Sequence, residues 1–258
     1  MGFLEDLFGL KGKRAALAGA GGLLIGEMSR TLAKAGVAVA VMDSSQEAAE
    51  KVRDEILAGG GDAIAVTLDV TSKLGWNAAL ERVTSELGGV EILVNGAGAN
   101  APTPFLDIPL EEWDEILRVQ LTGTMLGCQV FGGYMVQHRK GSIINISSAS
   151  SGPPLSKAFT YSVAKAGVKN LSQNLAREWA DVGVRVNALR PGFFPSQMMK
   201  EKFLTKERIH AILGHTPMKR FGEAAELAGC VLWLCSDAAS FVTGAEIPVD
   251  GGFTCMTI

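Results

Sequence analysis

The sequence predicts a single α/β domain: a doubly wound parallel sheet of about seven strands, Rossmann-like, with helices on both faces. A length of 258 residues suits one such domain. Short β-branched runs bounded by Gly or Asp alternate with helical segments of about ten residues or more. The 47% hydrophobic content and a mean hydropathy of +0.22 fit a sheet buried on both faces. The domain spans residues 1–258, without a linker or repeat.

The strand–helix alternation can be followed along the whole chain. Strands are expected at 14–18, 37–42, 62–70, 90–98, 141–148, 184–192 and 245–252. Helices are expected up to residue 35, over 44–60, 71–89, 110–138 and 159–181, and near 223–234. The stretch between the sixth strand and the last helix is expected to be irregular. This order predicts right-handed crossovers and ligand binding at the carboxyl ends of the strands.

Composition argues against several classes of protein. The net charge of −3 leaves no basic excess for nucleic acid, and the uncharged apolar stretch at 15–25 is shorter than the roughly 18 residues of a membrane span. No signal-peptide charge order is present, and four cysteines without CxxC spacing suit free thiols in a reducing compartment, so we expect a cytoplasmic protein. Three histidines lack metal-ligand spacing, so no metal is expected: His138, His210 and His215.

The glycine-rich stretch LAGAGGLLIGE at 17–27 follows the first strand and opens a helix. Gly19 and Gly21 fit GxGxxG spacing, but the third position is Leu24. Backbone N–H groups at a helix N-terminus bind a pyrophosphate whatever the side chains are. We therefore expect a working phosphate cradle; the alternative is a tight turn.

Polar residues follow the next three strands. Asp43, about 20 residues beyond the loop, is placed to accept both hydroxyls of an adenosine ribose and to repel a 2′-phosphate, which favours NAD over NADP. The alternative is an ordinary turn residue. Asp69 and Asn95 are likewise polar residues at the carboxyl ends of expected strands, and each is either a ligand contact or an ordinary turn residue.

The stretch SSASSGPPLSKAFTYSVAKAG carries the most information. Tyr161 and Lys165 lie four apart on an expected helix and share one face, and Ser148 ends the preceding strand. This resembles the Ser–Tyr–Lys signature of the short-chain dehydrogenase/reductase family. VNGAG at 94–98, RVNALRPGFF at 185–194 and SFVTGAEIPVDGG at 240–252 resemble further family motifs, so the resemblance covers nearly the whole chain. It implies a hydride transfer between a secondary alcohol and a ketone, and a substrate lid at about 195–215.

The chemistry expected of these residues follows from their charges. A phenol with a pKa of about 10 is a poor base at neutral pH. A lysine ammonium about 4 Å away contributes roughly 4 kcal/mol, enough to lower that pKa by about three units at most. Tyr161 is therefore expected as the general acid/base, and Ser148 as a hydrogen-bond donor to the substrate oxygen. By resemblance, Lys165 also holds the nicotinamide ribose. The alternative is an amphipathic helix pair and an ordinary serine.

The resemblance and the strand-edge pattern together give the expected cofactor-binding residues: Gly19, Gly22, Leu23, Leu24, Asp43, Asp69, Val70, Asn95, Gly96, Ala97, Tyr161, Lys165, Pro191, Gly192 and Phe194. The family also implies a homo-oligomer, a dimer or a homotetramer, acting on a small molecule.

The chain departs from the family pattern in three places. In the family's TGxxxGxG motif, Ala18, Leu23 and Ile25 replace the Thr and the second and third Gly. Gln120 stands where the family has an Asn that supports a proton relay. Arg190 stands where a small residue is usual; a buried arginine needs a partner, here either a residue of a neighbouring subunit or an anionic substrate.

The loop and the endings HTPMKRFGE and SDAASFVTGAEIPVDGGF resemble the fructuronate (mannonate) reductase-like and gluconate dehydrogenase-like branches. This implies carbohydrate metabolism, with a sugar, sugar acid or polyol as substrate. Asn100 and Ser150 are candidates to face it. Cationic residues of 200–220 either attract an anion or are ordinary solvated charges; they are Lys200, Lys202, Lys206, Arg208, His210, His215, Lys219 and Arg220. Alternatives are a 3-oxoacyl-thioester reductase and a dinucleotide-binding sensor or scaffold.

Overall fold

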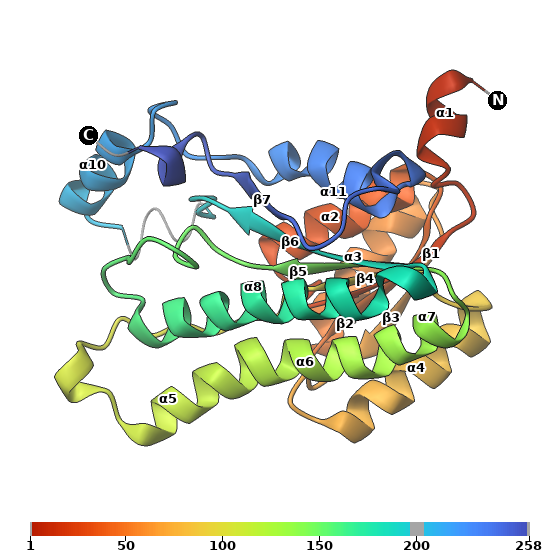
Figure 1. Ribbon diagram of the computed structural model, residues 1–258, viewed down its shortest axis with the longest axis horizontal. Coiled ribbons are helices and arrows are strands. Elements are labelled where there is room, and N and C mark those ends of the chain that lie inside the picture. Colours follow the sequence, from red (N-terminus) through yellow and green to blue (C-terminus); the bar gives the residue numbers. More distant parts are fainter. Residues whose placement is uncertain (1, 197–203, 257–258) are drawn as a thin grey trace.

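A computed structural model describes residues 2–196 and 204–256. Its centre is a seven-stranded sheet in the order β3-β2-β1-β4-β5-β6-β7, with all neighbouring strands parallel (Figure 1). The strands are β1 (Arg14–Ala18), β2 (Ala38–Asp43), β3 (Ala63–Thr67), β4 (Ile92–Asn95), β5 (Gly141–Ile146), β6 (Val184–Pro191) and β7 (Glu246–Val249). The expected doubly wound parallel sheet is confirmed.

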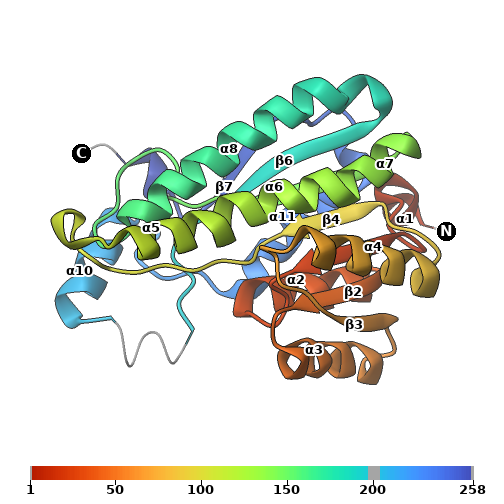
Figure 2. The ribbon, with the colours of Figure 1, turned by 90° about the horizontal axis from the view of Figure 1, so that it is seen from below.

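Helices cover both faces of the sheet (Figures 1 and 2). The main helices are α1 (Phe3–Phe8), α2 (Leu23–Lys34), α3 (Gln46–Ala58), α4 (Lys73–Leu87), α5 (Leu110–Leu117), α6 (Gly123–Gly127), α7 (Gly133–Gln137), α8 (Phe159–Trp179), α10 (Lys206–His215) and α11 (Ala228–Cys235). Short 3₁₀ turns lie at Phe105–Asp107, Ala180–Val182, Ala224–Leu227, Asp237–Ala239 and Phe253–Cys255.

Two apolar cores lie on opposite faces of the sheet. Helices α2, α3 and α11 pack on one face, and α4, α6, α7 and α8 pack on the other. Strand β1 contributes to both cores, because successive side chains of a strand point to opposite faces: Ala15 and Leu17 enter one, Ala16 and Ala18 the other. All four are buried, which explains why this strand reads as a continuous apolar run.

The long helical run after β4 is less regular than its sequence predicts. It is interrupted by two π-helical turns, Arg118–Thr122 and Cys128–Gly132, which separate α5, α6 and α7. Such turns are uncommon and often mark functional positions. The first contains Gln120, one of the departures from the family pattern.

The segment before the last helix is also more ordered than expected. Thr205 caps α10, accepting a hydrogen bond from the backbone N–H of Arg208 at 3.2 Å. Residues 197–203 of the expected lid, including Lys200 and Lys202, lie outside the described residues. In the part of the chain that is described, no helix is both long and apolar enough to cross a membrane.

The strand order places one edge of the sheet for ligand binding. β1 leads to β2 on one side, whereas β4 lies on the other side of β1, so the direction of winding reverses between β1 and β4. In open parallel sheets the crevice at the carboxyl ends of such strands is the usual ligand site. The loops after β1, β2, β4, β5 and β6 therefore border the candidate site.

Candidate active site

The turn after β1 has the backbone form of a phosphate cradle. Gly19 has φ +83°, and a Cβ built there would lie 2.7 Å from the backbone N and Cα of Ala97. The turn thus requires glycine both for its conformation and for the close approach of the β4 loop. Gly22 is the N-cap residue of helix α2 and offers no side-chain cap to the first-turn N–H groups, those of Leu23 and Leu24 among them. These features fit a pyrophosphate.

One departure from the family motif, Ile25, is accommodated by a glycine of the neighbouring loop. Ile25 replaces a motif glycine and is buried beneath the loop. Its Cδ1 occupies the space beside Gly96, where a Cβ would lie only 2.2 Å away. The larger residue on α2 is therefore accommodated by a glycine in the VNGAG turn. Leu23, the other replacement, is 46% exposed, so it adds bulk at the rim of the cradle and does not distort its base.

Asp43 ends β2 directly beside the cradle. Its two carboxylate oxygens accept backbone N–H groups on either side, from Gly21 at 2.9 Å and from Ser45 at 3.0 Å. These bonds fix the carboxylate against the glycine loop and leave lone pairs on both oxygens. The structure thus brings together the two features that the sequence assigned to a cofactor.

Asp69 and Val70 follow β3 in a turn that is stabilised locally. The Asp69 carboxylate accepts the backbone and hydroxyl hydrogens of Thr71, at 2.9 and 2.8 Å, which lowers the pKa of Asp69. The Val70 carbonyl accepts the indole N–H of Trp76 at 2.9 Å. Both residues lie at the carboxyl edge, with Asp69 held as a carboxylate.

Asn95 lies at the same edge, but its side chain points into the core. Its amide donates to Asn145 on β5 at 2.9 Å, and Cys128 lies 3.5 Å away. Asn95 and Asn145 are register partners of neighbouring strands, so the amide stabilises the sheet. The neighbouring Gly96 and Ala97 are left to line the cradle. The sequence signal for this pairing is Asn145, an asparagine near the end of the next strand, as Asn95 is at the end of β4.

The Ser–Tyr–Lys residues converge between β5 and α8. The Ser148 hydroxyl lies close enough to the Tyr161 hydroxyl to influence its pKa, and the Lys165 Nζ lies 5.6 Å from the centre of the Tyr161 ring. Lys165 is buried, and its Nζ donates to the carbonyl of Ile146 at 2.7 Å. The Ser148 Oγ accepts hydrogen bonds from the backbone N–H and the hydroxyl of Ser150, at 3.2 and 3.1 Å.

Burial dominates the electrostatics of this cluster. Desolvation raises the pKa of Tyr161, while the hydrogen bond with Ser148 lowers it; the net shift is upward. Burial lowers the pKa of Lys165 to about 7. The lysine therefore carries only part of its charge at neutral pH. The net pKa shift of Tyr161 is thus upward in this structure, and a lowering of the phenol pKa by Lys165 stays a prediction.

Gln120 lies in the first π-helical turn and is fully buried. Its Nε2 donates to the Ala99 carbonyl at 2.7 Å, and a Cβ on Gly98 would lie 2.9 Å from that nitrogen. Its Oε1 is buried without a protein partner. The longer side chain is thus anchored to the loop after β4.

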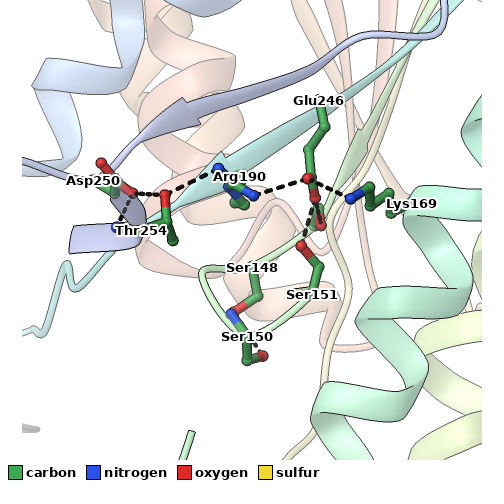
Figure 3. A network of polar contacts seen from close by, with 9 residues as sticks. Ser148, Ser150, Ser151, Lys169, Arg190, Glu246, Asp250 and Thr254 are labelled. Atoms are coloured by element: carbon green, nitrogen blue, oxygen red, sulfur yellow. Dashed lines mark hydrogen bonds and ion pairs between the residues drawn. The ribbon is translucent and has the colours of Figure 1, made fainter. Parts of the chain in front are cut away.

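The loop after β6 packs closely against the C-terminal segment. Gly192 donates its N–H to Val249 at 3.0 Å, and a Cβ there would lie 2.7 Å from the Asp250 Cα. Phe194 lies in the loop that follows Pro191, and its ring packs against Gly222. It therefore borders the carboxyl edge of the sheet on the side of β6. Arg190 pairs with Glu246 on β7 of the same chain, a partner that is neither of the two expected from the sequence (Figure 3).

Part of the expected cationic field is engaged within the chain. Arg208 on α10 contacts Ser156, donating to its carbonyl at 3.1 Å. Arg220 pairs with Glu226 at 2.6 Å, and the Lys219 ammonium donates to the Gly214 carbonyl at 2.9 Å. Among the described residues, no group of three His, Cys, Asp or Glu side chains is arranged to hold a metal ion.

Comparison with known proteins agrees with this geometry. A family model described as enoyl-(acyl carrier protein) reductase matches residues 25–254. An uncharacterised oxidoreductase, UxuB, of Bacillus subtilis is 37% identical, with 95% of each chain covered. The 5-keto-D-gluconate 5-reductase of Escherichia coli is 31% identical, covering 96% of this chain and 98% of its own.

Two solved structures have closely similar folds. A candidate D-mannonate oxidoreductase of Haemophilus influenzae with bound NAD has a TM-score of 0.90 at 33% identity, covering 96% of this chain and 97% of the other. A gluconate 5-dehydrogenase of Burkholderia cenocepacia, in complex with NADP and tartrate, has a TM-score of 0.92 at 29% identity, covering 98% and 100%. The two structures contain different nicotinamide dinucleotides.

Proposed function

This chain belongs to the short-chain dehydrogenase/reductase family of oxidoreductases, and we propose that it uses NAD to interconvert a secondary alcohol and a ketone on a sugar acid. The observation that supports the proposal most is the convergence of Ser148, Tyr161 and Lys165 at the edge that carries the glycine cradle. Sugars and polyols, which carry the same secondary alcohol groups, are the other substrate classes within this proposal. A nicotinamide cofactor, when bound at the cradle, would supply or accept the hydride.

The side chains then handle the proton and the oxygen. In the reducing direction, Tyr161 donates its phenolic proton to the carbonyl oxygen as the hydride adds to carbon. The raised pKa keeps the phenol protonated at neutral pH, which suits this role. Ser148 donates a hydrogen bond to the same oxygen. Lys165, with a pKa of about 7, is poised to return a proton to Tyr161.

The cofactor preference rests on Asp43. Its carboxylate is held by Gly21 and Ser45, and it is placed to accept the two ribose hydroxyls of NAD. A 2′-phosphate at this position would face the carboxylate charge. Titration of the protein with NADH and NADPH tests the preference, and Asp43→Asn provides the matched variant. We expect NADH to bind at least about tenfold more tightly than NADPH, and the variant to narrow the gap. Equal binding by the unaltered protein contradicts the assignment.

The substrate class is supported by the relatives, two of which are described by reactions on gluconate-type acids. The direct test is a turnover screen with 5-keto-D-gluconate and NADH, and with D-mannonate, D-gluconate and neutral polyols and NAD. Turnover of acids well above that of the neutral polyols supports the proposal. Turnover confined to neutral alcohols refutes the acid assignment.

A second candidate is reduction of the ketone of a 3-oxoacyl thioester. The description of the matching family model names a reductase of acyl-carrier-protein thioesters, although one that acts on their carbon–carbon double bond. Reduction of the ketone generally uses NADPH, whereas Asp43 disfavours a 2′-phosphate. Acetoacetyl thioester with each reduced cofactor, included in the same screen, separates the two candidates. A third candidate is a dinucleotide-binding sensor or scaffold with little activity. Binding of NADH without turnover of any substrate in the screen would distinguish it from the two enzymatic candidates.

We also propose a cytoplasmic homo-oligomer, a dimer or tetramer. The paired helices α5–α6 and α8 lie side by side on one side of the molecule (Figures 1 and 2). Large apolar side chains are exposed along them: Leu110, Met125, Phe159 and Val163. Light scattering of the purified protein measures the oligomer mass directly, and a monomer would contradict this part of the proposal.

A further inference from the structure

The turn that carries Ser148 is held by a carboxylate from a distant strand. Strand β5 ends at Ile146, and residues 147–151 form a tight turn in which the Ser151 N–H donates to the Ser148 carbonyl at 2.9 Å. Only two backbone bonds continue the pairing with β6, from Ser147 to Leu189 at 2.8 Å and from Ala149 to Pro191 at 3.1 Å. Side-chain bonds therefore have a large share in fixing this turn.

Glu246 supplies these bonds from β7, beyond β6. One oxygen of its carboxylate, Oε1, accepts the hydroxyl of Ser147 at 2.7 Å and that of Ser151 at 2.5 Å. The two serines stand on either side of the stretch that contains Ser148 and Ser150. A single acceptor atom thus ties both ends of the turn together.

The same carboxylate is balanced by two cations. Its Oε2 lies 3.0 Å from the Arg190 guanidinium and 3.4 Å from the Lys169 ammonium on α8 (Figure 3). The Glu246 side chain is only 7% exposed. Burial would raise the pKa of this carboxyl group, but the two serine hydroxyls and the two cations hold it below its ordinary range. Glu246 is therefore a permanent anion at neutral pH.

The network continues away from the site, which fixes the position of Arg190. Its second terminal nitrogen donates to the Thr254 hydroxyl at 3.0 Å, and Thr254 donates in turn to Asp250 at 2.5 Å (Figure 3). The chain of contacts runs from the C-terminal segment to the turn beside Ser148. Glu246 is not among the site residues that the sequence predicts, whereas Arg190 is one of the departures from the family pattern.

We propose that Glu246 is a positioning residue, which fixes the turn 147–151 and, through it, the Ser148 hydroxyl against Tyr161. The inference rests on the proposed function, because it requires Ser148 to contact the substrate oxygen. A carboxylate suits the task, since one oxygen accepts two hydroxyls while the other faces two cations. Glutamine retains an acceptor for the serines but turns an N–H₂ toward Arg190 and Lys169.

The test compares Glu246→Ala and Glu246→Gln with a matched control. Glu91 is also a mostly buried carboxylate paired with an arginine, Arg14, but it lies at the amino ends of β1 and β4, away from the site. Glu91→Gln therefore reports the general effect of breaking a buried ion pair. All three variants are measured for NADH binding, for kcat and for amide hydrogen exchange of the turn 147–151.

We expect Glu246→Ala to lower kcat by about 10- to 100-fold, with the Kd for NADH changed less than about twofold. Glu246→Gln should recover part of that loss, and Glu91→Gln should leave kcat unchanged. In a Ser148→Ala background, Glu246→Ala should add less than about a twofold loss, because it acts through Ser148. Additive losses in that background, or an equal kcat loss in Glu91→Gln, overturn the inference.

Hydrogen exchange tests the same inference without a substrate. Exchange of the turn 147–151 should accelerate at least about tenfold in Glu246→Ala and stay unchanged in Glu91→Gln. If the exchange rate of this turn is unchanged in Glu246→Ala, the positioning role of Glu246 is refuted, whatever the kinetics show. Absence of turnover by the unaltered protein on every substrate of the screen refutes the proposed function instead, and with it the positioning role.

Discussion

Replacing Lys165 by Met should stabilise the protein while abolishing turnover. The Lys165 side chain is only 3% exposed, and burial lowers its pKa from the ordinary 10.5 to about 7. The folded protein therefore binds fewer protons than the unfolded chain between these two pH values, so the stability of the unaltered protein rises with pH across this window. Burying the lysine charge lowers the free energy of unfolding by about 5 kcal/mol below pH 7, and this cost disappears near pH 10.5.

The size of the effect follows from this window. The cost is about 4 kcal/mol at pH 7 and about 2 kcal/mol at pH 9. Methionine has no such cost, but it leaves the Ile146 carbonyl without its hydrogen bond, a loss of about 1–3 kcal/mol at any pH. The variant should thus be more stable by about 1–3 kcal/mol at pH 7, and its advantage should shrink by about 2 kcal/mol by pH 9.

Urea unfolding at pH 7, 8 and 9, at one protein concentration, measures this difference. Lys51→Met, which removes an exposed lysine on α3, is the control and should show no such trend. A difference between Lys165→Met and the unaltered protein that stays constant from pH 7 to 9 would refute the reasoning, because the hydrogen-bond loss alone does not depend on pH.

Three further predictions concern the proton donor and the cradle. Tyr161→Phe should lower kcat by about 10²- to 10⁴-fold while the Kd for NADH, followed by fluorescence, changes little; retained turnover would exclude Tyr161 as the acid/base. Because the pKa of Tyr161 is raised, the reduction rate should stay flat through neutral pH, whereas the rate of alcohol oxidation should climb about tenfold per pH unit toward that pKa; pH profiles in both directions measure this. Gly19→Ala should weaken NADH binding by at least about tenfold, because its Cβ meets the Ala97 backbone. Gly60→Ala, with φ +80° and no atom within 4 Å of the new Cβ, shares the backbone strain and should leave NADH binding unchanged; equal weakening by both variants would reject the cradle.

The fold follows from local features of the sequence. Apolar runs such as the one ending at Ala18 predict strands because both faces of a parallel sheet are buried. Gly19 predicts a tight turn, and the spacing of Tyr161 and Lys165 predicts a shared helix face. These inferences need only neighbouring residues, so they hold without a tertiary structure. The π-helical turn that contains Gln120 does not follow from the sequence in this way, because no feature of the neighbouring residues indicates it.

The tertiary structure alone decided which distant residues serve each other. Ile25 is accommodated only because Gly96 lies against it, and Asn95 faces Asn145 and not the crevice. The carboxylate that holds the Ser148 turn comes from Glu246, 99 residues beyond Ser147. The direction of the pKa shifts at Tyr161 and Lys165 is also a tertiary property, because burial, which spacing along a helix does not reveal, sets the cost of their charges.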